Sequence, residues 1–349
     1  MLPVPASFIQ RGGHYTRLRS SSIPLDASSW RKTLFTRSRA TNLAVALGTL
    51  LCVLSLLLNA QLWLASQDAD IARAANAGAV VGGYPPLSIL STLNPRLRNL
   101  DHLIVVAGHA IWHGCSPEER MHEDDWILEP IQREQKLLST FFKHISKGAE
   151  LSLSDPKSLL VFSGGQTRST SLETEGASYL RLAHDAKLFG RDYNESAPFP
   201  RATSEQFALD SFQNVLFSIG RFHEVTGSYP SRITVVSFGA KRARFVELHS
   251  QALRWRADRF NYVGIDPADK AAAAMFQGEK QFGYAPYSKD LYGCHGELLA
   301  KRRKRNPFHR FHSYYTSSPE LAGLLDYCPG HLDGGQTHIY PGALPWDSP

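Results

Sequence analysis

The sequence predicts an α/β fold: a Rossmann-like, doubly wound, mainly parallel sheet, preceded by one N-terminal transmembrane helix. Two observations carry this prediction. From about residue 98, short apolar runs alternate with segments of helical periodicity, which is typical of a doubly wound domain. Nearer the N-terminus, residues 41–66 contain no charge and are long enough to cross a hydrocarbon layer of about 30 Å as a helix.

The apolar stretch has its membrane-binding centre at residues 43–65, with Trp63 at one end, where an interfacial aromatic residue belongs. Two alternatives compete with a membrane span. A cleaved signal peptide would lie closer to the N-terminus and have a shorter apolar core. A buried helix of a water-soluble domain would have a polar face, and this stretch has none.

The charge distribution predicts the orientation of this span. Residues 1–40 contain seven basic residues and one acid, Asp26, which account for the net charge of +6 and leave 31 basic and 31 acidic residues in 41–349. The positive-inside rule therefore places the N-terminus in the cytosol and the C-terminal domain in the lumen of a secretory compartment such as the endoplasmic reticulum or the Golgi. Because the basicity is confined to this flank, nucleic acid is not an expected partner.

We predict five regions along the chain. They are a disordered basic cytosolic tail (1–40), the transmembrane helix (41–66), a linker (67–97), a Rossmann-like domain (98–330) with an irregular extension from about 281, and a tail (331–349). Within the domain, the apolar patterns predict strands at 102–107, 159–162, 232–238 and 261–265, and helices at 129–147, 173–188, 204–224 and 241–254.

The most informative segment follows the apolar run 159–162. The chain continues there as Ser163-Gly164-Gly165-Gln166-Thr167-Arg168. Glycines let a ligand approach the backbone, and an arginine with backbone N–H groups suits an anion. A plain strand-to-helix turn is the alternative.

Two other predicted strands end in similar turns, Gly108-His109 and Gly239-Ala240-Lys241-Arg242-Ala243-Arg244. The carboxyl ends of parallel strands meet at one edge of the sheet, where open α/β sheets bind ligands. Basic residues at a helix start oppose the helix dipole, and a bound phosphate or carboxylate would remove that conflict. The alternative is that Lys241, Arg242 and Arg244 reach acids elsewhere or water.

Several residues suit proton transfer or ligand binding. His109 has a side-chain type whose pKa suits neutral pH, and Glu175 lies near the start of a predicted helix. Glu205, Asp210 and Asn214 fall in the predicted helix 204–224, with the last two four residues apart on one face. They could hold a metal, a ribose or a basic partner, or form a solvated face. No motif or spacing typical of a metal site, a Walker nucleotidase, a zinc protease or an α/β-hydrolase is present.

The cysteines and two surface motifs bear on the compartment. Cys294 and Cys328 could pair in a lumen, although Cys115 would then be left over, and Asn194 begins a glycosylation sequon. The basic run 301–305 could be a processing site, a phosphate patch or a solvated loop.

The order of these elements resembles a family of unknown function that includes the bacterial SanA, YdcF and ElyC proteins, in particular its fungal branch. The matching elements are 106–109, 163–168 with Glu175, Glu205 with Asp210 and Asn214, and 235–244. The resemblance implies a Rossmann-like domain, often tethered to a membrane, with links to envelope and lipid-carrier metabolism and to S-adenosylmethionine. Bacterial members commonly have a histidine at the basic helix start, which this sequence lacks.

Together these observations predict a membrane-anchored protein that binds a small anionic ligand, phosphorylated or nucleotide-like and lipid-linked in one version, and hydrolyses or transfers it. The alternatives are a non-catalytic module for S-adenosylmethionine or a nucleotide, and a structural membrane protein. The predicted catalytic residues are His109, Glu175 and Asp210. The predicted ligand-binding residues are Gly108, Ser163, Gly164, Gly165, Gln166, Thr167, Arg168, Glu205, Asn214, Lys241 and Arg244.

Overall fold

The computed structural model describes residues 39–76, 91–190, 198–267, 270–330 and 337–347. The chain divides into two compact units, residues 1–79 and 80–349. The sequon at Asn194, most of the predicted tail 1–40, and parts of the predicted linker and C-terminal tail lie outside the described residues.

The described part of the first unit is one long helix, α2 (Arg39–Asn76). Its segment Leu43–Trp63 is long and apolar enough to cross a membrane, by length and composition. The helix continues ten residues beyond the predicted start of the linker at 67, because Ala, Arg, Gln and Asp residues there sustain helical structure.

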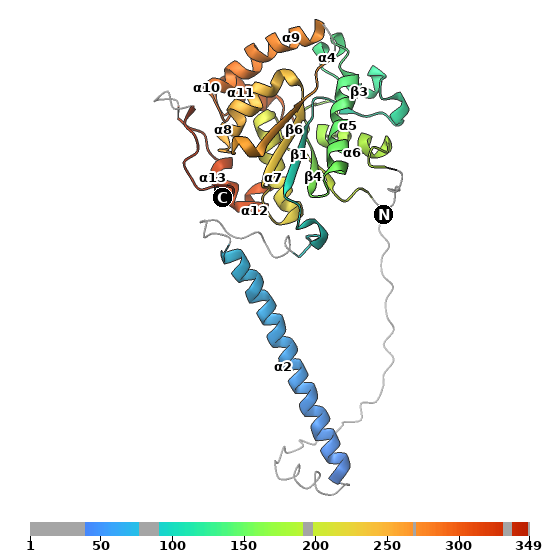
Figure 1. Ribbon diagram of the computed structural model, residues 1–349, viewed down its shortest axis with the longest axis vertical. Coiled ribbons are helices and arrows are strands. Elements are labelled where there is room, and N and C mark those ends of the chain that lie inside the picture. Colours follow the sequence, from blue (N-terminus) through green and yellow to red (C-terminus); the bar gives the residue numbers. More distant parts are fainter. Residues whose placement is uncertain (1–38, 77–90, 191–197, 268–269, 331–336, 348–349) are drawn as a thin grey trace, which may run out of the picture. The chain divides into compact units, whose positions relative to one another are not determined.

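The second unit contains a parallel five-stranded sheet, in agreement with the predicted α/β class (Figure 1). Its spatial order is β5-β4-β1-β6-β7, so the strands numbered along the chain follow the order 3-2-1-4-5 of a Rossmann-type sheet. In the central register, Val105 of β1 lies between Val161 of β4 and Val235 of β6. The strands are β1 (His102–Ala107), β4 (Ser158–Ser163), β5 (Ala202–Glu205), β6 (Arg232–Ser237) and β7 (Phe260–Gly264).

Helices cover both faces of this sheet, because successive strand residues point to opposite sides. Leu103 and Val105 pack against α7 (Ser211–Thr226), whereas Ile104 and Val106 pack toward α5 (Leu138–Ser154) and α6 (Glu175–Asp185). Figure 1 shows α5 and α6 on one side of the strands and α8, α10, α11 and α13 on the other. The remaining helices are α4 (Pro130–Glu134), α8 (Ser250–Ala252), α9 (Lys270–Glu279), α10 (Ala285–Lys289), α11 (Gly296–Lys304), α12 (Tyr314–Ser317) and α13 (Ala322–Leu325).

Short elements complete the domain. A small antiparallel sheet pairs β2 (Ile111–Trp112) with β3 (Trp126–Ile127). The single-turn and π-helical segments are η1 (Pro95–Leu97), η2 (Pro117–Glu119), η3 (Glu123–Asp125), η4 (Gly239–Lys241), η5 (Arg244–His249), η6 (Ala257–Arg259), η7 (Lys280–Tyr284) and η8 (Pro319–Leu321).

The predicted helix 173–188 spans only Glu175–Asp185, and the predicted helix 241–254 is mostly the π-helical η5, followed by α8. The other two predicted helices also have different bounds. The predicted helix 129–147 is interrupted at Lys136, whose positive φ of 49° ends α4 before α5 begins. The predicted helix 204–224 begins only at Ser211, because residues 202–205 form the edge strand β5 instead. Local periodicity misses this strand because its sequence, Ala-Thr-Ser-Glu, contains no apolar run. Its one fully buried residue is Glu205.

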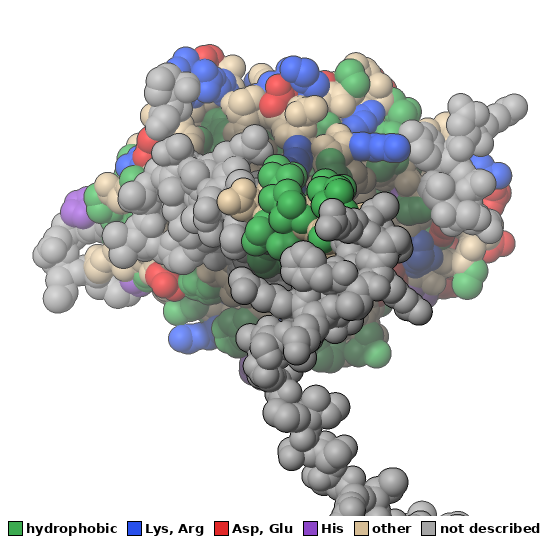
Figure 2. Space-filling model, turned by 90° about the horizontal axis from the view of Figure 1, so that it is seen from below, with side chains coloured by type: hydrophobic (Ala, Val, Ile, Leu, Met, Phe, Trp, Pro, Cys, Tyr) green, Lys and Arg blue, Asp and Glu red, His purple; other side chains and the backbone are tan. Residues whose placement is uncertain are grey.

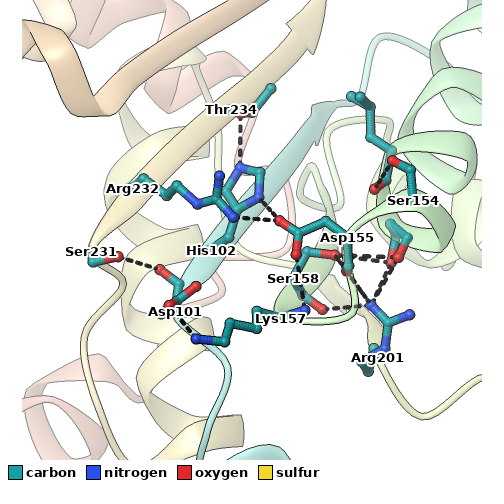
Figure 3. Close-up of polar contacts among 12 residues, drawn as sticks. Asp101, His102, Ser154, Asp155, Lys157, Ser158, Arg201, Ser231, Arg232 and Thr234 are labelled. Atoms are coloured by element: carbon teal, nitrogen blue, oxygen red, sulfur yellow. Dashed lines mark hydrogen bonds and ion pairs between the residues drawn. The ribbon is translucent and has the colours of Figure 1, made fainter.

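The amino edge of the sheet is closed by a polar network (Figure 3). The buried His102 ring lies 2.7 Å from Asp155 Oδ2 through Nδ1 and 2.8 Å from Thr234 Oγ1 through Nε2. Arg232 donates to the same Asp155 oxygen at 2.6 Å, and Arg201 donates to the backbone oxygens of residues 152, 155 and 158. These contacts join β1, β4 and β6 at the edge opposite their carboxyl ends.

The chain from about residue 281 packs on the core of the domain. Tyr287, Tyr292 and Tyr314 are buried in the cluster around α7. Residues 337–347, which were predicted to belong to a separate tail, also cover this core in the structure. Trp346 Nε1 donates there to Leu253 O at 2.7 Å. In the space-filling view from below, Lys and Arg side chains and Asp and Glu side chains are both spread over the surface (Figure 2).

One glycine lets α6 approach the sheet closely, and its replacement tests this packing. A Cβ at Gly176 would overlap Glu205 O and lie 2.5 Å from Phe162 O, both backbone atoms. We expect Gly176→Ala to lower the free energy of unfolding by about 1–3 kcal/mol through overpacking. Chemical denaturation measures this change. Gly278→Ala is the control, because open space surrounds Gly278 in α9, and an equal loss in both variants would contradict the packing argument.

Candidate functional site

A cavity of about 240 Å³ lies beyond the carboxyl ends of β1, β4 and β6 and beside the start of α7. This is the crevice where the strand order reverses, the usual ligand site of an open α/β sheet. Turns distant in sequence therefore meet at one place. Its lining residues include Gly108, His109, Glu129, Gln132, Thr167, Arg168, Glu175, Leu209, Asp210, Ser211, Asn214, Phe238, Lys241, Phe245 and Arg305.

Glu175 forms one wall of the cavity and is held there by two glycine turns. A Cβ added at Gly108 or at Gly164 would lie 2.7 Å from the Glu175 Cβ, so each of these positions excludes a larger residue. Glu175 N donates to Gly165 O at 3.1 Å, and Thr167 Oγ1 donates to Glu175 Oε1 at 2.6 Å. Glu175 as a whole is 8% exposed, and it is positioned by backbone and hydroxyl groups.

Lys241 contributes a cationic group from the turn after β6. Its Nζ lies 3.3 Å from His109 Nδ1 and 5.2 Å from the centre of the Phe238 ring. Burial, and after it the nearby Arg244 guanidinium, lower the pKa of Lys241 to about 7. An anion in direct contact with Nζ would raise this pKa, because an opposite charge favours the protonated amine.

Two arginines complete the basic side of the cavity. Arg168 pairs with Glu129 at 2.7 Å, so part of its charge is neutralised within the protein. Arg305 Nη1 donates to Leu209 O at 3.1 Å, and no ion pair of Arg305 is present within the described ranges. The side chains of Arg305 and Lys241 thus leave positive charge available to a ligand.

His109 sits in a partly aromatic environment. Its Nε2 lies 3.1 Å from Ser237 Oγ, and its ring packs 4.7 Å from Phe238 and 5.6 Å from His144. Burial lowers the pKa of His109 well below its usual value, and Lys241 lowers it further. His109 is therefore neutral at physiological pH, which suits it to hydrogen bonding or to transient proton relay.

Asp210 lines the cavity but is engaged in structural contacts. It caps α7 by accepting from Gln213 N at 2.9 Å through Oδ1, and its Oδ2 accepts from Arg302 Nε. Burial raises the pKa of Asp210, but the Arg302 guanidinium outweighs this and the pKa falls below its usual value. The ionised carboxylate orients the start of α7, one turn before Asn214.

Six predicted site residues do not line the cavity: Ser163, Gly164, Gly165, Gln166, Glu205 and Arg244. Gln166 Nε2 donates to Ser171 O at 3.2 Å. Glu205 lies at the end of β5 and is fully buried, and it accepts from Ser163 Oγ at 2.8 Å and from Phe207 N at 2.6 Å. These groups shape the turns around the cavity without facing it.

The basic helix start after β6 is compensated within the protein. Arg244 pairs with Glu279 at 3.0 Å, and Ala240 N donates to Asp266 Oδ1 at 3.1 Å. The Asp266 carboxylate thus takes the place that the sequence analysis assigned to a ligand anion. The alternative that these basic groups reach acids elsewhere holds for Arg244, whereas Lys241 faces the cavity.

Four polar residues that line the cavity were not predicted as site residues: Glu129, Gln132, Ser211 and Arg305. Arg305 belongs to the basic run 301–305, which forms the end of α11 and the residue after it rather than a wholly solvated loop, since Arg302 is largely buried. The basic run itself was the signal for Arg305. Gln132 of α4 donates through Nε2 to His109 O at 2.7 Å. No local sequence pattern predicts this contact.

Among the described residues, the groups of metal-type ligands lie away from the cavity. The described residues contain two groups of three metal-type ligands, Cys294 with His295 and Cys328, and Glu119 with His122 and Asp125. Neither group lines the cavity, and the two cysteines of the first form a disulfide. A volume of about 240 Å³ is below the roughly 300–1,000 Å³ of sites that enclose a drug-sized ligand.

The chain is similar to a curated protein of yeast. The chain is 30% identical over 259 residues to the uncharacterized protein YOR238W of Saccharomyces cerevisiae, covering 61% of this chain and 86% of the yeast protein. No protein-family model matches the chain, and no solved structure matches it. The resemblance to the SanA, YdcF and ElyC family stays a prediction.

The buried Glu205 predicts a pH dependence of stability. Burial raises its pKa from 4.5 to about 7, so folding favours the protonated form and this contribution is lost as the pH rises through about 7. We expect the wild type to lose up to about 3 kcal/mol relative to Glu205→Gln between pH 4.5 and 7. Denaturation curves across this range measure the difference. A difference that stays constant with pH would contradict the shifted pKa.

Proposed function

We propose that this chain, which belongs to the same family as that yeast protein, is a membrane-anchored α/β protein that binds a small phosphorylated ligand in the cavity. One observation carries the proposal: Lys241 and Arg305 line the cavity, and neither has a carboxylate ion-pair partner within the described ranges. Charge-assisted hydrogen bonds to phosphate oxygens would satisfy both cations.

The size of the cavity supports a phosphoryl headgroup as the enclosed part of the ligand. About 240 Å³ accommodates a phosphate with a few further atoms. A nucleoside or a lipid chain would extend outside the cavity. A complete S-adenosylmethionine would likewise be only partly enclosed.

Hydrolysis or transfer of the phosphoryl group is the activity that the acidic wall favours. Glu175 lines the cavity, and its carboxylate has no cationic partner within the described ranges. A carboxylate in this position can accept a proton from water or a hydroxyl nucleophile. Glu175 would act as general base while Lys241, Arg168 and Arg305 stabilise the charge on the transferred group.

A non-catalytic binding module is the second candidate. One of the three residues predicted to handle protons is withdrawn from that role, because Asp210 is paired with Arg302. Such a site would retain the ligand without turnover and report its concentration.

The cysteines and the N-terminal charges support a luminal compartment for the α/β domain. Cys294 and Cys328 form a disulfide that links the loop before α11 to the segment after α13, and disulfides persist in oxidising compartments. We infer that the N-terminus is cytosolic and that the α/β domain is luminal, in agreement with the positive-inside rule.

Replacement of Arg305 tests the ligand-binding proposal. We expect Arg305→Ala to weaken the binding of inorganic phosphate about tenfold, because one charge-assisted hydrogen bond is lost. Isothermal titration calorimetry measures the affinity. Arg303→Ala is the matched control, because Arg303 is an exposed residue of the same basic run and does not line the cavity. Equal affinities for both variants and the wild type would contradict the proposal.

The luminal placement is tested by protease protection of intact secretory vesicles. We expect the domain from residue 98 to resist added protease until detergent is present, because the membrane encloses it. Peptide mapping without reductant should recover the peptides of Cys294 and Cys328 as one linked species. Digestion in intact vesicles, with both thiols free to react with maleimide, would place the domain in the cytosol.

A further inference from the structure

We propose that Lys241 is a nucleophilic amine that forms an imine with the carbonyl group of a small phosphorylated aldehyde or ketone held in the cavity. This inference rests on the proposed function, because the phosphate contacts would bring the carbonyl carbon to the amine. It goes further by naming the chemical class of the ligand and a covalent step.

The position of Lys241 suits a nucleophile. Its backbone N donates to Phe238 O at 3.0 Å, which fixes the turn after β6, and its side chain lines the cavity. No carboxylate lies within ion-pair distance of Nζ among the residues that the structure describes. A buried lysine that salt-bridges a carboxylate stays protonated, whereas one among cations loses its proton more readily.

The groups around Lys241 come from every element packed against it. The basic groups are Arg244 of η5 and Arg305 after α11, and the imidazoles are His109 and His144. The acids are Glu175 of α6 and Glu279 of α9. Glu279 is paired with Arg244, so its charge is already compensated. This environment brings the pKa of Lys241 to about 7, which leaves a large fraction of the amine unprotonated at neutral pH.

Imine formation at Lys241 needs only the amine and the carbonyl compound. The Nζ lone pair attacks the carbonyl carbon, and the carbonyl π electrons move to oxygen. One Nζ proton is transferred to that oxygen to give a carbinolamine, and His109 Nδ1, 3.3 Å from Nζ, can relay it. The second Nζ proton leaves with the hydroxyl as water, and the C=N bond forms. An amine and a carbonyl compound thus become an imine and water, with no oxidant or reductant.

The arrangement of the arginines explains why the carbonyl compound would carry a phosphate. Arg168 and Arg305 line the same cavity as Lys241 and provide bidentate donors suited to phosphate oxygens. The cavity has a volume of about 240 Å³. Once a phosphate is bound to these arginines, the remaining space holds a chain of about two or three carbon atoms between the phosphate and Nζ. A phosphorylated carbonyl compound of three carbons satisfies both demands.

Reductive trapping on the full-length chain in detergent tests the inference. Incubation with glyceraldehyde 3-phosphate and cyanoborohydride converts the imine to a stable secondary amine, which peptide mass spectrometry locates. We expect one dominant adduct on Lys241, formed at least about tenfold faster than on any other lysine, with a rate that rises through about pH 7. Unphosphorylated glyceraldehyde should modify Lys241 more slowly, because it lacks the anchor.

Two variants provide the controls. Lys241→Arg retains the positive charge and removes the nucleophile, so the dominant adduct should disappear while the circular dichroism spectrum is preserved. Lys143→Arg replaces an exposed lysine of α5 and should leave the adduct unchanged. A wild-type adduct that is spread evenly over exposed lysines would overturn the inference.

Phosphate affinity, measured in parallel, separates the two proposals. If phosphate binds but Lys241 forms no adduct, the imine is wrong and the proposed function stands. If phosphate does not bind and both aldehydes modify Lys241 equally, the phosphorylated substrate class and the proposed function both fail.

Discussion

The close contact of Glu175 with two glycine turns is the constraint on which the candidate site depends. Residues 107 and 163 are paired in the parallel register of β1 and β4, so the turns after both strands begin at the same level. Gly108 and Gly164 leave just enough room for the Glu175 side chain between them. The first turn of α6 therefore packs against the edge of the sheet, and the cavity lies beside it.

The balance of charge around this edge decides which groups face a ligand. Asp210 with Arg302, and Arg244 with Glu279, form ion pairs within the protein. Asp266 satisfies the helix start after β6. Arg305 keeps uncompensated positive charge in a partly buried cavity, where electrostatic interactions are stronger than in water, and Lys241 lines the same cavity without an ion-paired acid among the described residues.

The two edges of the sheet differ in what their polar groups do. At the amino edge, His102, Asp155 and Arg232 bond to one another and leave little capacity for a ligand. At the carboxyl edge, Glu175 and Lys241 make few internal bonds and face a cavity. The carboxyl edge therefore has polar groups available to a ligand, whereas those of the amino edge are satisfied within the protein.

The sequence by itself determined the α/β class, the apolar helix and the turns after β1, β4 and β6, because buried parallel strands and membrane-compatible helices leave continuous apolar runs. Only the tertiary structure decided which polar residues face the cavity. Edge strand β5 lacks an apolar run, and Arg305 reaches the cavity from 64 residues beyond Lys241. The partners of Arg244 and Asp210 likewise come from α9 and α11. Ion pairs and cavity walls arise from long-range packing, which local periodicity does not encode.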